Sequence, residues 1–343
     1  MPRSKKESLS SSQQQRVTMR DIAEAAGVHV MTVSNALSGA RVVAPATREK
    51  VQRIARELNY IPNSAARALA TGQTGLIAIL SGTMNEPYYA NMVHLLEQQM
   101  NAEGYKPVLV RTPREVKDLA TATGNTAVDG AIAIDMHEMV EVFRLHSAVP
   151  CVAIGTFERS FVDCVTVDLS AAVEAALSCM LAAGRQRIAY LATVHLMASA
   201  QEVRARTYLA AMEKAGRKPR IINVNTGVFE EVGTRLKINI KKNGCPDALL
   251  CQNDQTAMCA YRVLRDLGFR VPEDVLLVGC DGQLQMKYFD PPLSTIRQPM
   301  EETCATAWNF LKRRLAEPAL PIQHAFLQGE LVIRESLQPL NQT

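Results

Sequence analysis

Short apolar runs separated by stretches of helical periodicity fill the chain from residue 76 onward. The runs include LIAIL, GAIAID and CVTVD in the first half and RIAYLA, DALLCQN and DVLLVGCDG in the second, and each has the length of a buried strand. Alternating strands and helices are typical of parallel sheets that are covered on both faces. Two series of about five strands therefore predict an α/β fold with two doubly wound parallel-sheet subdomains.

The segments between these runs have helical spacing, so they predict the helices that cover the two sheets. Doubly wound sheets bind ligands outside the carboxyl ends of their strands, so we expect a ligand pocket in the cleft between the two facing subdomains. The helices predicted in this region cover residues 89–103, 117–125, 171–183, 203–215, 229–243 and 256–267.

The amino-terminal part has a different pattern, that of short amphipathic helices. Thr18 can cap a helix and Asp21 follows three positions later, so we expect a helix to begin near Met19. Gly27 supplies a turn, and a second helix then runs from residue 29 to a C-terminal cap at Gly39. The side chains predicted to face the core of this region are Ile22, Ala23, Ala26, Val33 and Leu37.

Two short helices joined by a glycine turn have two interpretations. One is a helix-turn-helix, whose second helix can enter the major groove of DNA, and the other is an ordinary helical hairpin. A third helix follows a cap region at Thr47, with Val51, Ile54 and Leu58 on one face, and completes a small core. The hydrophobic pattern alone leaves both interpretations open.

Residues 61–75, IPNSAARALATGQTG, separate this small core from the rest of the chain. Pro62 ends the preceding helix and Asn63 can cap a new one, but SAARALA is too short to form a stable helix alone. A marginal helix between two domains is a candidate switch. We therefore predict a small all-α headpiece and a larger body, organised as a flexible tail (1–15), the headpiece (16–60), a hinge helix and linker (61–75) and the body of two subdomains (76–338).

Charge is distributed unevenly along the 343 residues. Residues 1–75 hold 11 Lys and Arg against 5 Asp and Glu, whereas the remainder holds 27 against 29. A basic excess over the predicted helices is what a nucleic-acid partner requires. No apolar run is long enough to span a bilayer, and the first residues lack the apolar core of a secretory signal, so we expect a cytoplasmic protein. Eight scattered cysteines without a CxxC or Cys/His cluster indicate reduced core residues, with no metal site.

Three segments of the amino-terminal region, VTMRDIAEAAGV, TVSNALSG and TREKVQRIARELNYIPN, occur in the order found in one protein family. This region resembles the DNA-binding domain of the LacI/GalR family of bacterial transcription regulators. The resemblance implies that Val30, Met31 and Asn35 read base edges, where Asn35 can pair with adenine and the other two can contact a thymine methyl group. It places Thr18, Thr32 and Ser34 near phosphates, and it leaves His29 as a phosphate contact or a bystander. The other predicted DNA-binding residues are Thr47, Asn63, Ala66 and Leu69.

In the family that this chain resembles, the hinge helix folds on operator DNA and inserts a leucine at the central base step. The matching residue here is Leu69, with Ala66 packing against the groove or the twin helix. Wedging an apolar side chain into a base step costs a few kcal/mol of unstacking, which contacts to the bent duplex offset. The alternative for Leu69 is a helix residue that simply packs on the body.

The body resembles the effector domain of the same family, over NEPYYANMVHLLEQQMNAEGY, QNDQTAMCAYRVLRDLGFRVPEDVLLVGCDG and PPLSTIRQP. The resemblance implies effector binding by Arg204, Asn253 and Asp281, with Asp254 capping the next helix. Asp281 can accept hydrogen bonds from sugar hydroxyls, and the fork of Arg204 suits a carboxylate. Weaker candidates are Asp168, for the cleft or the crossover, and Phe229, as an aromatic lid. Simpler roles stay open: a turn residue for Asp281, a surface charge for Arg204 and a helix cap for Asp168.

Departures from the family pattern leave the ligand open. Cys280 stands where an aromatic residue is frequent, Gly282 stands where an acidic or polar one is common, and ASAQEVRART lacks the usual glycine after the arginine. The effector expected from the sequence is a sugar, a sugar acid or a related metabolite, without any cofactor.

A homodimeric repressor that binds a pseudo-palindromic double-stranded operator is the function that these features predict, because two half-sites related by a dyad require a symmetric protein. The resemblance implies a dimer surface at residues 89–101 and 285–288, and the absence of terminal heptads argues against a tetramerising coiled coil. A solute-binding protein without promoter control is the alternative. The chain lacks GxGxxG after a first strand, the P-loop, HExxH and GxSxG motifs, so an enzyme is not expected.

Overall fold

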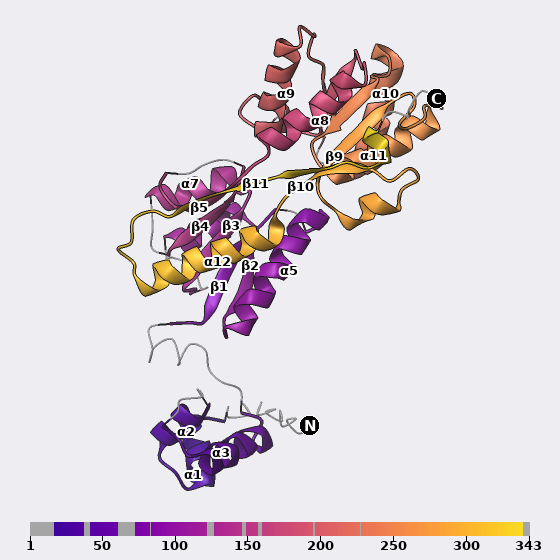
Figure 1. The fold of residues 1–343 in the computed structure, drawn as a ribbon. Helices are drawn as coiled ribbons and strands as arrows, with labels where there is room; N and C mark the ends of the chain where they lie inside the picture. Colours follow the sequence, from indigo (N-terminus) through magenta and orange to yellow (C-terminus); the bar gives the residue numbers. More distant parts are fainter. Residues whose placement is uncertain are drawn as a thin grey trace, which may run out of the picture. The chain divides into compact units, whose positions relative to one another are not determined.

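The chain divides into two compact units, Met1–Gly72 and Gln73–Thr343 (Figure 1). The structure, a computed structural model, describes residues 17–37, 42–60, 73–82, 84–121, 127–145, 149–156, 160–194, 196–226 and 228–338. The predicted tail, Gly39 and the hinge positions Asn63, Ala66 and Leu69 lie outside the described residues. The headpiece and the body are therefore considered separately.

Three helices form the headpiece: α1 (Met19–Ala26), α2 (Val30–Leu37) and α3 (Pro45–Glu57). The predicted start at Met19 is confirmed, because Asp21 Oδ2 accepts hydrogen bonds from the backbone N–H of Thr18 at 2.7 Å and from its hydroxyl at 2.9 Å. Gly27 ends α1 with a φ of 64°, a left-handed conformation that favours glycine. The turn between α1 and α2 thus forms where the sequence predicts it.

The headpiece core lies where the three helices meet. Its buried side chains are Ile22, Ala23, Ala26, Val33, Ala36, Val43, Val51, Ile54 and Ala55. Leu37 and Leu58, both predicted to face inward, are only partly buried against this cluster, and Ala36 takes the buried place in α2. The expected cap at Thr47 is wrong: Ala44 is the N-cap of α3, Pro45 is its first residue, and Thr47 lies inside the first turn.

The first subdomain of the body is a six-stranded sheet in the order β11-β5-β4-β3-β1-β2. All neighbouring strands run parallel. Its strands are β1 (Leu76–Leu80), β2 (Lys106–Val110), β3 (Gly130–Ile134), β4 (Cys151–Gly155), β5 (Asp163–Asp168) and β11 (His324–Gln328). Its helices are α5 (Pro87–Ala102), α6 (Pro113–Ala120), α7 (His137–Leu145) and α12 (Met300–Ala316).

The second subdomain repeats the plan with the strand order β12-β10-β9-β8-β6-β7, in which only the edge strand β12 is antiparallel. Its strands are β6 (Ile188–Ala192), β7 (Ile221–Asn223), β8 (Ala248–Cys251), β9 (Leu276–Asp281), β10 (Ser294–Arg297) and β12 (Glu330–Val332). Its helices are α8 (Ser170–Ala182), α9 (Val203–Lys214), α10 (Phe229–Asn243) and α11 (Asp254–Asp266), with short 3₁₀ turns η1 (Leu196–Ala198), η2 (Leu284–Tyr288) and η3 (Glu335–Leu337).

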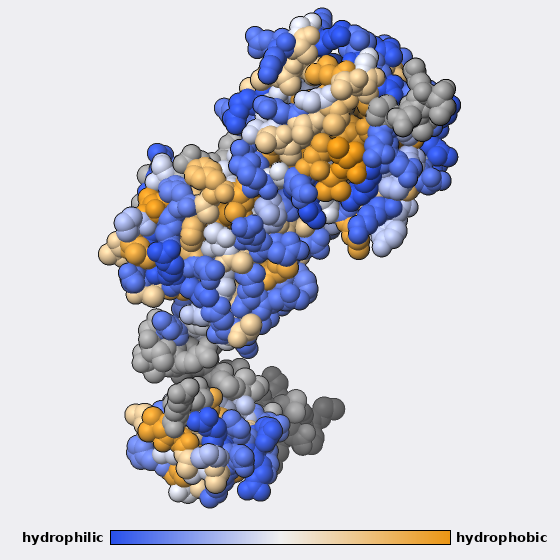
Figure 2. Space-filling model, viewed as in Figure 1, coloured by the Kyte–Doolittle hydropathy of each residue, from blue (hydrophilic) through white to orange (hydrophobic). Residues whose placement is uncertain are grey.

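Apolar residues on both faces of each sheet explain why helices cover both faces. The central strands β3, β4, β6 and β8 are buried along their whole length, and each sheet contributes to two apolar clusters, one on each face. The face seen in Figure 2 is mostly hydrophilic, with apolar patches between. The prediction of two doubly wound parallel-sheet subdomains is confirmed.

Some helix boundaries differ from the sequence prediction. The helix expected at 117–125 is α6, which begins four residues earlier at Pro113 and, in the described part of the chain, ends at Ala120. Thr112 caps it, because its hydroxyl accepts from the N–H of Glu115 at 3.2 Å while the Glu115 carboxylate accepts from the Thr112 N–H at 2.9 Å. The capping box T-x-x-E marks this start in the sequence. No helix among the described residues is long and apolar enough to cross a lipid bilayer.

The chain passes between the two subdomains three times, from β5 to α8, from β10 to α12 and from β11 to β12. These crossover segments meet: the N–H of Gly329 donates to the carbonyl of Asp168 at 2.9 Å. In Figure 1 they run side by side at the junction of the two sheets. The carboxyl ends of parallel strands from both sheets therefore border one region, which is where a doubly wound fold places its ligand.

Candidate functional site

The outward face of α2 is the first candidate site. Met31 is 63% exposed, although it is a large apolar residue in a folded helix. Thr18 and His29 are exposed as well, and Thr32, Ser34 and Asn35 are half-buried. Val30 differs from the prediction of a fully outward side chain, because it packs partly against the headpiece core. An exposed methionine on the second helix of a helix-turn-helix is available to contact a groove.

His29 has a structural role that the sequence did not indicate. Its ring nitrogen Nδ1 accepts a hydrogen bond from the backbone N–H of Met31 at 3.2 Å. The imidazole therefore occupies the place that Ser, Thr, Asp or Asn takes in most helix caps. With Nδ1 as acceptor, the neutral ring carries its proton on Nε2, which is the donor left to meet a phosphate.

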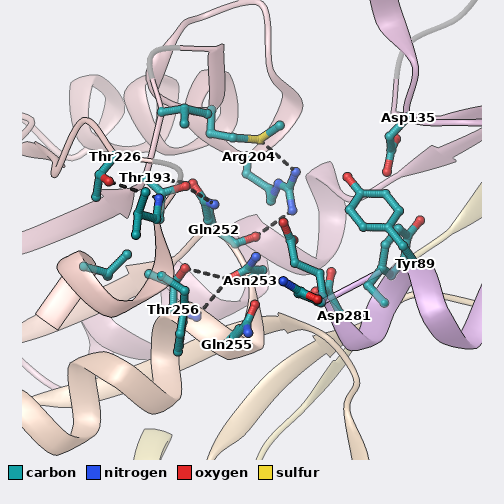
Figure 3. Close-up of a pocket in the computed structure, with 18 of the residues that line it drawn as sticks. Tyr89, Asp135, Thr193, Arg204, Thr226, Gln252, Asn253, Gln255, Thr256 and Asp281 are labelled. Carbon is teal, nitrogen blue, oxygen red and sulfur yellow. Dashed lines mark hydrogen bonds between the residues drawn. The ribbon is translucent and has the colours of Figure 1, made fainter. Parts of the chain in front are cut away.

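A cavity of about 780 Å³ lies between the two subdomains of the body (Figure 3). Its walls come from the ends of strands and the starts of helices on both sides. The first subdomain contributes Asn85, Glu86, Tyr88, Tyr89, Asp135 and Thr156, and the second contributes, among others, Thr193, Arg204, Thr226, Phe229, Gln252, Asn253, Gln255 and Asp281. The cleft expected from the sequence is thus a polar cavity, and it brings together Arg204, Asn253, Asp281 and Phe229.

Asp281 is the last residue of β9 and is 4% exposed. Its φ of 118° is a backbone conformation that non-glycine residues rarely adopt. Gln298 Nε2 donates to its Oδ1 at 2.9 Å. Burial, followed by the neighbouring charge of Asp254, raises the pKa of Asp281 well above its usual range. The carboxyl group is held rigidly at the cavity wall, so the simple role of a turn residue does not describe it.

Asn253 takes the capping role that the sequence suggested for Asp254, and it keeps its place at the cavity. Asn253 is the N-cap of α11, where its Oδ1 accepts from the N–H of Thr256 at 2.8 Å. Asp254 points into the protein instead, and its carboxylate accepts from the Thr295 hydroxyl and from the N–H of Gln283, each at 2.6 Å. The prediction that Asp254 caps α11 is wrong. Asn253 caps the helix and lines the cavity as well.

Arg204 is buried rather than a surface charge. Its Nε donates to Glu202 Oε1 at 2.8 Å, and its Nη1 donates to the carbonyl of Gln252 at 2.6 Å. Nη2 points to the sulfur of Met197 at 3.5 Å. Glu202 is fully buried, and its other oxygen accepts from the N–H of Arg204 at 2.8 Å as the cap of α9. The guanidinium fork that the sequence assigned to a ligand carboxylate is therefore largely occupied by the protein.

Asp135 is a cavity residue that the sequence interpretation missed. It directly follows β3, as Asp281 ends β9, and it also has a positive φ, 52°. Burial, opposed by Arg204, raises its pKa to about 6. The sequence does carry a signal for it, because Asp135 ends the apolar run GAIAID as Asp281 ends the apolar part of VGCDG.

Tyr89 and Gln252 were also missed. Tyr89 lies beside Asp135 in Figure 3, and its ring packs against the place where a side chain on Gly82 would begin. Gln252 Nε2 donates to the Thr193 hydroxyl at 2.7 Å, and its Oε1 accepts from the N–H of Thr193 at 2.7 Å. These contacts fix the amide, so its backbone carbonyl is in place to receive Arg204.

The two weaker candidates have different positions. Phe229, the first residue of α10, borders the cavity and is 39% exposed, as an aromatic lid requires. Asp168 is not among the described residues that line the cavity. Its Oδ1 accepts from the N–H of Ser170, the first residue of α8, at 2.9 Å, but Leu169 holds the N-cap position.

A small basic headpiece with an exposed second helix, joined to a two-subdomain body around a polar cavity, defines a ligand-responsive DNA-binding regulator. Residues 18–63 match the model of the bacterial regulatory proteins of the lacI family. Residues 178–337 match a periplasmic binding protein-like domain. The chain thus combines a lacI-family DNA-binding domain with a periplasmic binding protein-like domain.

Known relatives cover nearly the whole chain. The ribose operon repressor of Haemophilus influenzae is 29% identical over 331 residues, which is 94% of this chain and 99% of the repressor. The transcriptional regulator CelR of Thermobifida fusca is 29% identical over 336 residues, 94% of this chain and 98% of the regulator. Among solved structures, a lac repressor dimer bound to operator and the anti-inducer ONPF is 25% identical, with a TM-score of 0.78 over 94% of this chain and 99% of that one.

Proposed function

We propose that the protein is a homodimeric transcriptional repressor that binds a pseudo-palindromic operator, and that a small hydroxylated metabolite in the cavity sets its operator affinity. The observation that carries this proposal is the combination in one chain of an exposed second helix with a cavity walled by two subdomains. A solute-binding protein without promoter control needs only the cavity, so it leaves the headpiece unexplained. Operator binding also implies that the protein is located in the cytoplasm, where bacterial DNA lies. It further implies that the role of the protein is regulatory rather than catalytic.

Two copies of the chain suit the proposed operator. The lac repressor relative binds its operator as a dimer, and half-sites related by a dyad favour a protein with the same symmetry. The predicted dimer surface includes η2, where Leu284 is 56% and Tyr288 is 77% exposed. Exposed apolar side chains of this size support burial against a second copy.

The cavity supports a hydroxylated ligand because its polar groups come from both subdomains. Asp281, Asn253 and Gln252 line it from the second subdomain, and Asp135 lines it from the first. CelR has been solved in complex with cellobiose, and another relative is named a ribose operon repressor. A ligand that contacts both walls favours one arrangement of the subdomains, and it changes DNA affinity only by its differential affinity for the two arrangements.

Operator binding is tested with the full-length chain on DNA from upstream of its own gene. Footprinting should protect two half-sites, and fluorescence anisotropy should show affinity that falls steeply with salt but stays at least 1,000-fold above that for random duplex, about the specificity of known repressors. A metabolite library is then screened by thermal shift, and hits are tested for a change in operator affinity. Equal affinity for operator and random DNA, with and without hits, would overturn the proposal.

A further inference from the structure

The charge balance of the cavity narrows the class of ligand. Arg204 is the one basic residue among the described residues that line the cavity, and the ion pair with buried Glu202 neutralises it. The same described lining holds four acidic residues, Glu86, Asp135, Glu230 and Asp281. Acidic groups therefore outnumber basic groups around the cavity in the part of the chain that the structure describes.

Asp135 is the acidic residue that the protein leaves without a partner. Asp281 accepts from Gln298, but the Asp135 carboxylate has no hydrogen bond or ion pair with any described residue. Its position depends on Gly155: a Cβ on Gly155 would lie 2.8 Å from Asp135 Oδ1. The absence of a side chain at Gly155 therefore leaves room for this carboxylate at the end of β4. Asp135 also lines the cavity (Figure 3).

Groups from several elements face Asp135. Tyr88 and Tyr89 of α5 and the preceding Glu86 approach it from the first subdomain, and Arg204 with Glu202 approaches from the second. Of these groups, only Arg204 is cationic, and its guanidinium forms an ion pair with Glu202. Glu86 and Glu202 are acidic like Asp135, so their negative charges raise the pKa of Asp135. Arg204 is thus the one described cation that stabilises an ionised Asp135, and Glu202 and Glu86 oppose it.

We propose that the ligand of this cavity is a hydroxylated amine, such as an amino sugar, whose ammonium group is bound by Asp135 while its hydroxyls meet Asp281 and Asn253. This inference rests on the proposed function and names the ligand class of the same cavity. Closure around a ligand removes the water that now solvates Asp135, and an unpaired buried carboxylate is unfavourable. An ammonium group supplies the missing charge, a neutral sugar does not, and a sugar acid adds a repulsive one.

The direction of proton exchange on ligand binding distinguishes these ligand classes. An ammonium group lowers the pKa of Asp135 from about 6, so binding releases protons and tightens as the pH rises from 5 to 7. A neutral sugar that buries Asp135 favours its protonated form, so binding takes up protons and weakens over the same range. The sign of the pH dependence therefore reports the charge of the ligand group that meets Asp135.

The test is isothermal titration of the full-length chain with glucosamine, glucose and glucuronate, with galactosamine, galactose and galacturonate, and with a library of hydroxylated amines. We expect at least one amine to bind, at least tenfold more tightly than its neutral parent and more tightly still than its acid, with affinity that rises from pH 5 to 7. The inference is overturned if no amine binds, if a neutral parent or an acid binds as tightly as the amine, or if amine affinity falls over that range.

Asp135→Asn is the decisive variant, because asparagine tolerates a positive φ and preserves the backbone. It should reduce the preference for the amine over its neutral parent to less than twofold, and a retained preference would overturn the role of Asp135. Asp118→Asn, at a half-buried residue of α6 outside the cavity lining, is the control that should keep the wild-type preference. Operator affinity is measured on the same samples: if a neutral sugar or an acid controls it, the charge inference fails while the proposed repressor function stands.

Discussion

Gln298 and Asp281 are joined by a hydrogen bond from Nε2 to Oδ1 of 2.9 Å at the wall of the cavity. The other end of the same amide, Oε1, lies 3.4 Å from the hydroxyl of Tyr88 in the first subdomain. Gln298 itself belongs to the crossover segment between β10 and α12. A ligand that competes for Asp281 therefore acts directly on a contact that connects the two subdomains.

Asp281→Asn should leave the body at least as stable as wild type and weaken the ligand response. Burial and Asp254 raise the pKa of Asp281 because they disfavour its charged form, and an amide of the same size avoids that cost. We expect a midpoint of thermal unfolding that is equal to or a few degrees above wild type, which corresponds to about 1 kcal/mol, and at least tenfold weaker ligand binding. Asp254→Asn is the contrasting variant: it weakens the bonds from Thr295 and Gln283 and should lower the midpoint. An intact ligand response in Asp281→Asn would contradict its assignment.

Asp135 should make the body less stable as the pH rises. Its pKa is raised from 3.8 to about 6, so the folded state binds this proton more tightly than the unfolded state does. The resulting stabilisation is fully present below pH 3.8 and is lost as the pH rises through about 6. Relative to Asp135→Asn, the wild-type chain should lose about 2 kcal/mol between pH 4.5 and 7, which urea unfolding at the two pH values measures. A constant difference between the two chains would contradict the raised pKa.

Glu202→Gln should let the cavity accept anions. Removing the carboxylate leaves Arg204 buried without its counter-ion, and breaking a buried pair in this way costs about 3 kcal/mol of stability. The unpaired guanidinium should then bind glucuronate or galacturonate at least tenfold more tightly than the wild-type chain does, and these acids should restore the thermal midpoint. Asp163→Asn disrupts the buried ion pair with Arg314 away from the cavity, and it should cost stability without any gain in acid binding.

Local signals in the sequence predicted the headpiece and the strand ends well. Thr18 with Asp21 marked the start of α1, and the acidic end of VGCDG marked Asp281, because caps and buried strands depend on neighbouring residues. Glu202 was not recognised as the partner of Arg204, since the sequence shows three charges in ASAQEVRART but not that Glu202 and Arg204 are buried. The parallel pairing of β11 with β5 joins residues about 160 positions apart, and no local pattern encodes such a pair.

Met31→Ala should weaken operator binding without unfolding the headpiece. The Met31 side chain is 63% exposed, so its removal leaves no cavity in the core and should change stability by less than about 0.5 kcal/mol. Loss of an apolar base contact should reduce operator affinity by about tenfold, within the range of a single mismatched position, and should leave affinity for random DNA unchanged. Val42→Ala, 87% exposed and outside α2, is the matched control. Equal losses on operator and random DNA would show that Met31 does not read sequence.

A side chain added at Gly329 should uncouple ligand binding in the cavity from DNA binding. It lies between β11 and β12, and a Cβ there would meet Leu169 Cδ2 at 2.6 Å and Ile296 Cγ2 at 3.4 Å, atoms of or beside the other two crossover segments. Gly329→Ala should therefore cost about 1–3 kcal/mol through overpacking and restrict the movement of the subdomains. Gly130→Ala, whose Cβ would meet Leu311 Cδ1 at 2.8 Å within one subdomain, should cost a similar amount and leave the coupling intact. The measurement is the ratio of operator affinities with and without ligand for both variants. This ratio should approach one only in Gly329→Ala. Equal ratios in the two variants would show that the crossover segments do not couple ligand binding to DNA binding.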